Sequence, residues 1–171
     1  MRKTLLVFAL LSALFVGCTP APQTITTFIL VRHGEKADDG TKDPDLTADG
    51  AARANELARV LSETDIDAIY STPYKRTHET VEPTATAKGL PILDYTAMEG
   101  GEMDKILNAH RGGTVVISGH SNTTPWTVNY FLGSETYPEF ESSDFDNIMV
   151  LSIIEKGNAK LTWLNYGAAS H

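Results

Sequence analysis

Two similar stretches, far apart in the chain, constrain the fold more than any other feature of the sequence. Each is an apolar run that ends abruptly in polar residues, at 28–35 (FILVRHGE) and at 114–121 (TVVISGHS). Short apolar runs of this kind are typical of buried strands in an α/β sheet. Ligands of such sheets bind beyond the carboxyl ends of the strands. The pattern therefore predicts that His33 and His120 lie at the same edge of one sheet.

The rest of the chain predicts helices that alternate with strands. Apolar residues at helical spacing follow Thr47, which is a good N-cap, and the polar residues between them, Arg53 included, are expected to face solvent. Thr72-Pro73 and Thr124-Pro125 each predict a helix start, because a capping residue precedes a proline. Further strands are expected at 66–71 and 90–93, with a closing hairpin at 148–166.

This alternation of strands and helices is typical of βαβ units. We therefore expect an α/β fold, a three-layer αβα sandwich whose sheet is mainly parallel. The closing hairpin adds an antiparallel edge.

The first 25 residues have the composition of a targeting segment. Arg2 and Lys3 precede an apolar run at 5–16, which is too short to span a bilayer and fits the core of a secretory signal. The run leads into Gly17-Cys18, which resembles the bacterial lipoprotein signal, in which the cysteine is acylated. The alternative is a plain secretory signal with an incidental cysteine.

From this we expect a signal peptide at 1–17, a Pro/Thr-rich tether at 18–25 and one domain at 26–171. Cys18, the only cysteine in the chain, would carry a lipid that anchors the protein to a membrane without spanning it. The expected location is the extracytoplasmic face of the bacterial cell envelope.

The charge balance narrows the class of ligand. The full chain has a net charge of −8, and without residues 1–17 it has 12 basic against 22 acidic side chains, a net charge of −10. Such a balance argues against nucleic acid and against adhesion to anionic lipid. Any anion site must be a local basic pocket, so small phosphorylated molecules are the expected partners.

Phosphoryl transfer needs groups that this sequence supplies at its strand-to-helix junctions. A neutral imidazole is a competent nucleophile at neutral pH, and arginine binds phosphate with two parallel hydrogen bonds. Arg32 and His33 end the first run, Arg76 begins a helix after the next strand, and His120 ends the second run. We expect these four side chains to converge on one phosphate.

These residues lie in motifs that resemble those of the histidine phosphatase superfamily, whose fold is the phosphoglycerate mutase-like fold. Residues 32–35 (RHGE) resemble its Arg-His-Gly signature, and residues 46–50 (LTADG) resemble its Leu-Thr-x-x-Gly helix opening. Residues 70–80 (YSTPYKRTHET) are similar to its Tyr-Ser-Ser-Pro-x-x-Arg-x-x-x-Thr segment, and residues 119–121 (GHS) to its second-histidine motif.

The resemblance implies a role for each residue. His33 would be the nucleophile that becomes phosphohistidine, while Arg32, Arg76 and His120 would bind the phosphoryl group. No metal and no organic cofactor would be needed. Many members of the family carry a glutamate proton donor in a long insertion before the second histidine. Here that region is short, and Glu99 is the candidate.

Glu35, beside the nucleophile, is a second candidate for the proton donor. The sequence thus predicts a phosphatase for small phosphomonoesters or phosphohistidine. Alternatives are a phosphoglycerate mutase-type phosphotransferase, a metal hydrolase using His33, Glu35 and His120, and a non-catalytic envelope module that binds phosphorylated ligands. The short region disfavours a mutase, which must retain its intermediate.

Overall fold

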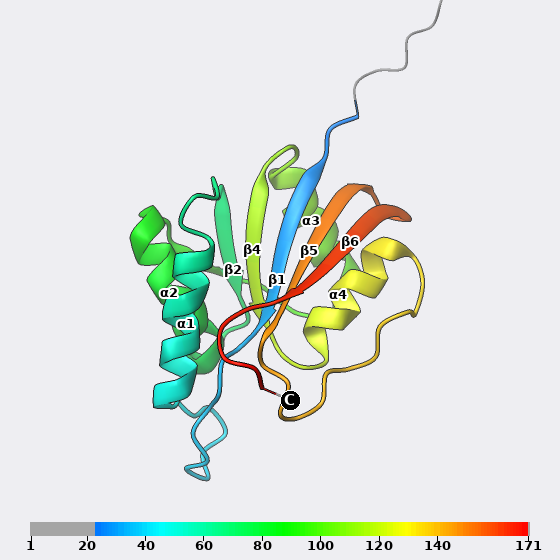
Figure 1. Ribbon diagram of the computed structural model, residues 1–171. Helices are drawn as coiled ribbons and strands as arrows, with labels where there is room; N and C mark the ends of the chain where they lie inside the picture. Colours follow the sequence, from blue (N-terminus) through cyan, green and yellow to red (C-terminus); the bar gives the residue numbers. More distant parts are fainter. Residues whose placement is uncertain (1–22, 171) are drawn as a thin grey trace, which may run out of the picture.

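The protein folds around one sheet of six strands. The computed structural model describes residues 23–170, so the predicted signal peptide and Cys18 lie outside the described part of the chain. The strands are β1 (Thr26–Arg32), β2 (Ala68–Ser71), β3 (Ile92–Asp94), β4 (Thr114–Gly119), β5 (Asn147–Glu155) and β6 (Asn158–Asn165). Their order across the sheet is β3-β2-β4-β1-β5-β6 (Figure 1). The first four are parallel, and β5 and β6 are antiparallel to their neighbours.

Four helices cover the two faces of this sheet. They are α1 (Ala48–Val60), α2 (Lys75–Lys88), α3 (Gly100–Ala109) and α4 (Thr123–Leu132). Phe28 and Leu30 of β1 pack with residues of α3 and α4, whereas Ile29 and Val31 pack with residues of α1 and α2. This alternation is what a strand buried on both faces requires. It confirms the predicted α/β sandwich with a parallel sheet and an antiparallel edge.

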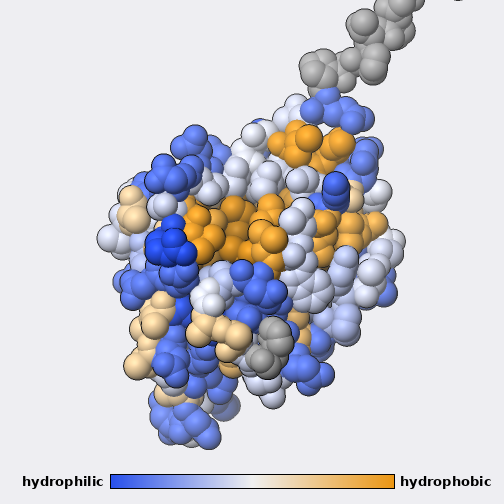
Figure 2. All heavy atoms as spheres, viewed as in Figure 1, coloured by the Kyte–Doolittle hydropathy of each residue, from blue (hydrophilic) through white to orange (hydrophobic). Residues whose placement is uncertain are grey.

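The helices do not cover the two faces evenly. α1 and α2 lie side by side over the β2 side of the sheet, away from β5 and β6 (Figure 1). Seen from the same side, hydrophobic residues form a band across the middle of the molecule (Figure 2).

None of the helices within residues 23–170 combines the length and the hydropathy needed to cross a membrane.

The predicted helix starts are partly right. Thr47 caps α1, since its hydroxyl accepts a hydrogen bond from the Gly50 backbone N–H at 3.2 Å. The predicted cap at Thr72 is wrong, because α2 begins only after Tyr74 and no side chain caps it. The Thr72 hydroxyl bonds instead to His120 and Thr77. A residue that looked like a helix cap therefore belongs to the site described below.

The expectation that Arg53 faces solvent is also wrong. Arg53 lies on the same buried face of α1 as Gly50, Ala54 and Leu57, and it is only 4% exposed. A buried guanidinium needs partners for its N–H groups. Glu35 supplies a carboxylate at 2.6 Å, and backbone carbonyls near the end of the chain accept the remaining hydrogen bonds.

Candidate active site

The two histidines meet because β1 and β4 are neighbouring parallel strands. Arg32, at the end of β1, is in register with Gly119, at the end of β4. His33 and His120 follow these positions, and the His33 backbone N–H donates to the Gly119 carbonyl at 2.9 Å. The centroids of the two imidazole rings are 5.4 Å apart, with an edge-to-face angle of 68°. The structure thus places both rings at the carboxyl edge of the sheet.

Two glycines allow the chain to turn tightly after His33. A Cβ on Gly34 would lie 2.9 Å from the Gly50 carbonyl oxygen. A Cβ on Gly50 would overlap the Glu35 carbonyl oxygen, so this position also excludes a side chain. The start of α1 therefore packs directly against the backbone that carries His33. This contact gives the glycines of the two motifs a physical role.

The main chain fixes the proton of the His33 ring. Its Nδ1 lies 2.7 Å from the Gly34 carbonyl oxygen, which accepts hydrogen bonds and cannot donate them. Nδ1 therefore carries the proton, and the lone pair is on Nε2. Burial, opposed by the hydrogen bond to the Gly34 carbonyl and assisted by the charges of Arg32, His120 and Arg76, lowers the pKa of His33 to about 3. His33 is a neutral imidazole with a free electron pair at any pH near 7.

His120 is held by contacts at both ring nitrogens. Its Nε2 lies 2.9 Å from the Thr72 hydroxyl, which donates its own proton to Thr77 at 3.0 Å. Nε2 must therefore be the donor, which leaves Nδ1 facing an Arg76 Nη2 at 3.5 Å. Burial first, and then the charges of Arg76 and Arg32, lower the pKa of His120 to about 4.

The two arginines each have an unpaired nitrogen. The Nε atoms of Arg32 and Arg76 are buried and have no hydrogen-bond partner in the described part of the chain. Arg76 makes a contact at 3.5 Å with Asp43, and its guanidinium lies 4.5 Å from the centroid of the Tyr74 ring. A buried N–H without an acceptor is costly. Two such groups beside the histidines are a chemical reason to expect an anion there.

A pocket of about 420 Å³ opens beside His120. His33 does not line it and is only 4% exposed, in edge-to-face contact with His120. Arg76 is the one cation among the described residues that line this pocket, and none of them carries a carboxylate. The lining consists of Thr72, Pro73, Tyr74, Arg76, Tyr95, Thr96, Ala97, His120, Asn122 and Thr123.

Neither candidate proton donor lies in this pocket. Glu99 is an exposed residue at the N-terminal end of α3. Glu35 is paired with Arg53. Partial burial alone would raise the pKa of Glu35, but the hydrogen bonds and the charge of Arg53 outweigh it and keep this pKa below its usual range. A carboxylate held in this way is a poor proton donor. Asp43 lies in the loop between β1 and α1, for which the sequence predicted no role in the site. Its negative charge partly opposes the lowering of the His120 pKa.

Sequence reasoning also missed the segment that holds Arg32. Two Nη1 hydrogen bonds of 2.7 Å reach the carbonyls of Glu141 and Asp144, and Nη2 donates to the Ser142 carbonyl at 3.1 Å. The Phe145 ring centroid lies 4.1 Å from the guanidinium carbon. These residues belong to a polar connection more than a hundred positions from Arg32 in sequence. No local pattern in the sequence indicates this contact.

Across the described residues 23–170, no group of three or more His, Cys, Asp or Glu side chains is arranged to bind a metal ion. The site therefore contains the four residues predicted to bind phosphate but, within this described range, no cluster of metal ligands. These residues are Arg32, His33, Arg76 and His120. Arg32 and Arg76 both act electrostatically on His33 and on His120.

The sequence matches the model of the histidine phosphatase superfamily (branch 1) over residues 28–99. That range includes Arg32, His33 and Arg76, together with three of the four motifs. Phosphoserine phosphatase 1 of Hydrogenobacter thermophilus is 42% identical over 71 residues, which cover 38% of this chain and 34% of that protein. The match thus spans about a third of the length of this curated relative.

Solved structures share the fold at low sequence identity. The protein histidine phosphatase SixA bound to tungstate is similar with a TM-score of 0.68 and 21% identity, over 82% of this chain and 96% of its own. The mycobacterial glucosyl-3-phosphoglycerate phosphatase has a TM-score of 0.69 and 15% identity, over 84% and 100%. Phosphoserine phosphatase of Entamoeba histolytica has a TM-score of 0.62 and 19% identity, over 84% and 97%.

The family match, the fold and the four motifs agree. Over residues 28–99 this chain is therefore similar to the histidine phosphatase superfamily, and its fold is similar to those of the solved phosphatases.

Proposed function

We propose that this protein is a phosphatase that hydrolyses small phosphomonoesters or phosphohistidine through a phosphohistidine intermediate on His33. The observation that carries the proposal is the state of the His33 ring. Its Nδ1 proton is bound to the Gly34 carbonyl at 2.7 Å, so Nε2 presents a lone pair beside His120 and two arginines. This is the arrangement that an attack on phosphorus needs.

The reaction follows from these positions. The Nε2 lone pair attacks phosphorus, an N–P bond forms, and the bond to the leaving group breaks with its electron pair. Water then attacks the phosphohistidine, breaks the N–P bond and releases inorganic phosphate. Arg32 and Arg76 stabilise the negative charge on the non-bridging oxygens in both steps, and His120 adds to this when the bound anion favours protonation of its Nδ1.

The pocket favours substrates whose leaving group departs easily. No carboxylate lines it among the described residues, so no acid in the pocket is positioned to protonate an alkoxide. Imidazole, with an ordinary pKa of about 6.5, is a much weaker base than an alkoxide and needs less help to leave. Phosphohistidine and aryl phosphates are therefore the preferred substrates within the proposed class.

The pocket offers little binding to a second negative charge. Arg76 is its one cation among the described lining residues, and Arg76 is assigned to the phosphoryl group. A substrate such as phosphoglycerate brings an additional carboxylate, which would find no partner there. This argues for hydrolysis of substrates whose leaving group carries no additional negative charge, and against the mutase alternative.

The test is a substrate screen with phosphohistidine, p-nitrophenyl phosphate, phosphoserine and 3-phosphoglycerate, with the His33→Ala protein as control. Release of phosphate by the unaltered protein and not by His33→Ala is the expected result. Full activity of His33→Ala would refute the assignment. Phosphate binding without hydrolysis of any of the four substrates would support the non-catalytic binding module instead.

We also propose that acylated Cys18 anchors the domain at the envelope. The support is the sequence of residues 1–18 and the polarity of β1, which begins at Thr26 and ends beside His33. A seven-residue strand is about 23 Å long, so the site lies at the edge of the sheet opposite to Thr26. Labelling with radioactive palmitate should depend on Cys18. Equal labelling of a Cys18→Ser variant would contradict the proposal.

A further inference from the structure

The guanidinium of Arg32 is oriented by a segment far away in sequence, residues 141–146. Three of its five N–H groups donate to the backbone carbonyls of Glu141, Ser142 and Asp144, and the ring of Phe145 lies against it. The remaining donors are the Nε–H and one Nη2–H, and the Nε atom is buried without a partner. The 141–146 segment thus leaves one edge of the guanidinium free for an anion.

One hydroxyl group fixes this segment in turn. The Oγ of Ser170 accepts hydrogen bonds from the backbone N–H groups of Phe145 and Asp146, at 2.8 and 3.1 Å. It donates its own proton to the Asp146 carboxylate at 3.0 Å. A serine hydroxyl has one proton and two lone pairs, so all of its capacity is used. Without it, two N–H groups of the segment would lose their acceptor.

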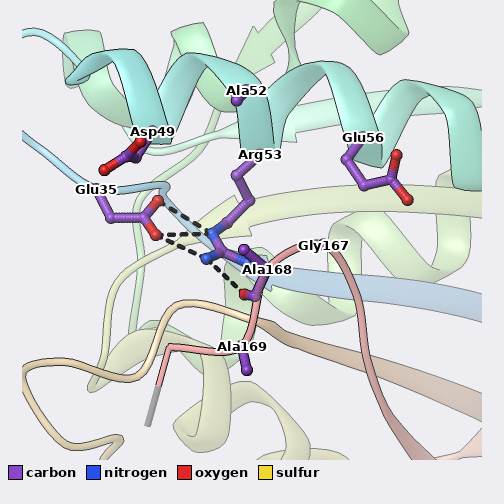
Figure 3. A pocket seen from close by; sticks show the side chains of 8 residues that line it. All are labelled: Glu35, Asp49, Ala52, Arg53, Glu56, Gly167, Ala168 and Ala169. Atoms are coloured by element: carbon purple, nitrogen blue, oxygen red, sulfur yellow. Dashed lines mark hydrogen bonds and ion pairs between the residues drawn. The ribbon is translucent and has the colours of Figure 1, made fainter.

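Arg53 holds the backbone that leads to Ser170. Figure 3 shows its guanidinium between the carboxylate of Glu35 and the end of the chain. It donates to the carbonyls of Tyr166 and Ala168, both at 3.0 Å, and to Glu35 at 2.6 Å. The backbone here borders a hollow of about 570 Å³, so polar contacts and not tight packing determine its position.

These contacts form one continuous path. Glu35 is two residues from the nucleophile, Arg53 joins Glu35 to residues 166–168, and Ser170 joins that backbone to the segment that orients Arg32. The path therefore links the turn after His33 with the guanidinium beside it. A shift of Ser170 would move the carbonyls that orient Arg32.

We propose that Ser170 is a positioning residue for phosphoryl binding, and that it acts through residues 141–146 on Arg32. This inference rests on the proposed function, because it assigns Arg32 to the phosphoryl group. Ser170 itself touches no reacting atom. Its hydroxyl keeps the free edge of Arg32 turned toward the anion, and it thereby sets the affinity of the site for phosphate.

The test measures binding of inorganic phosphate to the full chain by calorimetry, without any turnover. Ser170→Ala should weaken binding about threefold to tenfold, the range that one or two net hydrogen bonds supply. Ser170→Thr, which keeps the hydroxyl, should restore it. Ser62→Ala is the matched control, since Ser62 is exposed and its side chain makes no hydrogen bond in the described structure.

A double-mutant cycle separates positioning from a general structural role. In an Arg32→Ala background, adding Ser170→Ala should cause no further loss of phosphate affinity, because the group on which it acts is gone. Phe145→Leu, which leaves Ser170 intact, should also weaken binding in the unaltered background and not in Arg32→Ala. An unchanged affinity in Ser170→Ala, or an equal loss in both backgrounds, would overturn the role of Ser170 and leave the proposed function unaffected. An absence of phosphate binding by the unaltered protein would overturn the proposed function with it.

Discussion

The rings of His33 and His120 lie 5.4 Å apart, and each has a fixed proton. In His33 the proton is on Nδ1, bound to a backbone carbonyl, and in His120 it is on Nε2, bound to Thr72. The lone pairs are therefore on Nε2 of His33 and on Nδ1 of His120. The first is suited to attack phosphorus, and the second faces Arg76, where a bound phosphate would favour its protonation.

Replacing His120 tests its part in binding the transition state. His120→Asn should lower kcat about 10²- to 10³-fold with a smaller change in KM, because the lost contact is strongest when charge develops on the phosphoryl oxygens. Steady-state kinetics with p-nitrophenyl phosphate measures both constants. His110→Asn is the control, since His110 bonds to Tyr70 and follows α3, at the opposite edge of the sheet. A KM effect alone would assign His120 to ground-state binding.

Stability should depend on pH through the same two histidines. In the folded protein their pKa values are lowered to about 3 and about 4, from an ordinary 6.5. Below about pH 6.5 the unfolded chain therefore binds protons that the folded chain does not, and the free energy of unfolding falls as the pH drops. The contribution is fully present above pH 6.5 and is lost toward pH 4 and below.

Urea unfolding at pH 7.0, 6.0 and 5.0 measures this dependence. The midpoint should fall steadily with pH in the unaltered protein and less steeply in the His33→Asn/His120→Asn variant. Identical slopes in the two proteins would show that these imidazoles titrate normally when folded.

The ion pair between buried Arg53 and half-buried Glu35 should be important for stability. Arg53→Met leaves the Glu35 carboxylate and two backbone carbonyls without their donor and should cost about 3 kcal/mol of unfolding free energy. Arg59→Met is the matched control on the same helix. Arg59 is paired with Glu56, but its side chain is 72% exposed and solvent screens the pair, so the loss of unfolding free energy should be far smaller than for Arg53→Met. Equal losses in the two variants would contradict the role assigned to Arg53.

The role of Glu99 as proton donor can be tested through the leaving group. Because Glu99 is exposed and does not line the pocket, Glu99→Gln should change kcat by less than about twofold. The comparison uses p-nitrophenyl phosphate, which needs no acid, and phosphoserine, which does. A tenfold or larger loss with phosphoserine only would make Glu99 the donor, as the family resemblance suggested.

Sequence patterns predicted the elements whose signal is periodic or local. The apolar runs that end in His33 and His120 became neighbouring strands, and Thr47 became a helix cap. The charge of Arg53 predicts a solvent-facing side chain, but its spacing from Gly50 and Leu57 places it on the buried stripe of α1.

The missed parts of the site depend on contacts between distant residues. Thr72 has the local appearance of a cap, and only the fold shows that its hydroxyl meets His120. The segment that orients Arg32 is an irregular loop with no repeating pattern. Its position is set by hydrogen bonds to Arg32 and to Ser170, which lie on either side of it in the chain.

The most direct test of the central claim is to trap the intermediate. The protein is mixed with a ³²P-labelled phosphorylated substrate, quenched in alkali within milliseconds, digested and mapped by mass spectrometry. We expect an acid-labile label on the peptide that contains His33, with none in the His33→Ala protein. Turnover by the unaltered protein with no label on His33, or with the label on another residue, would contradict the account.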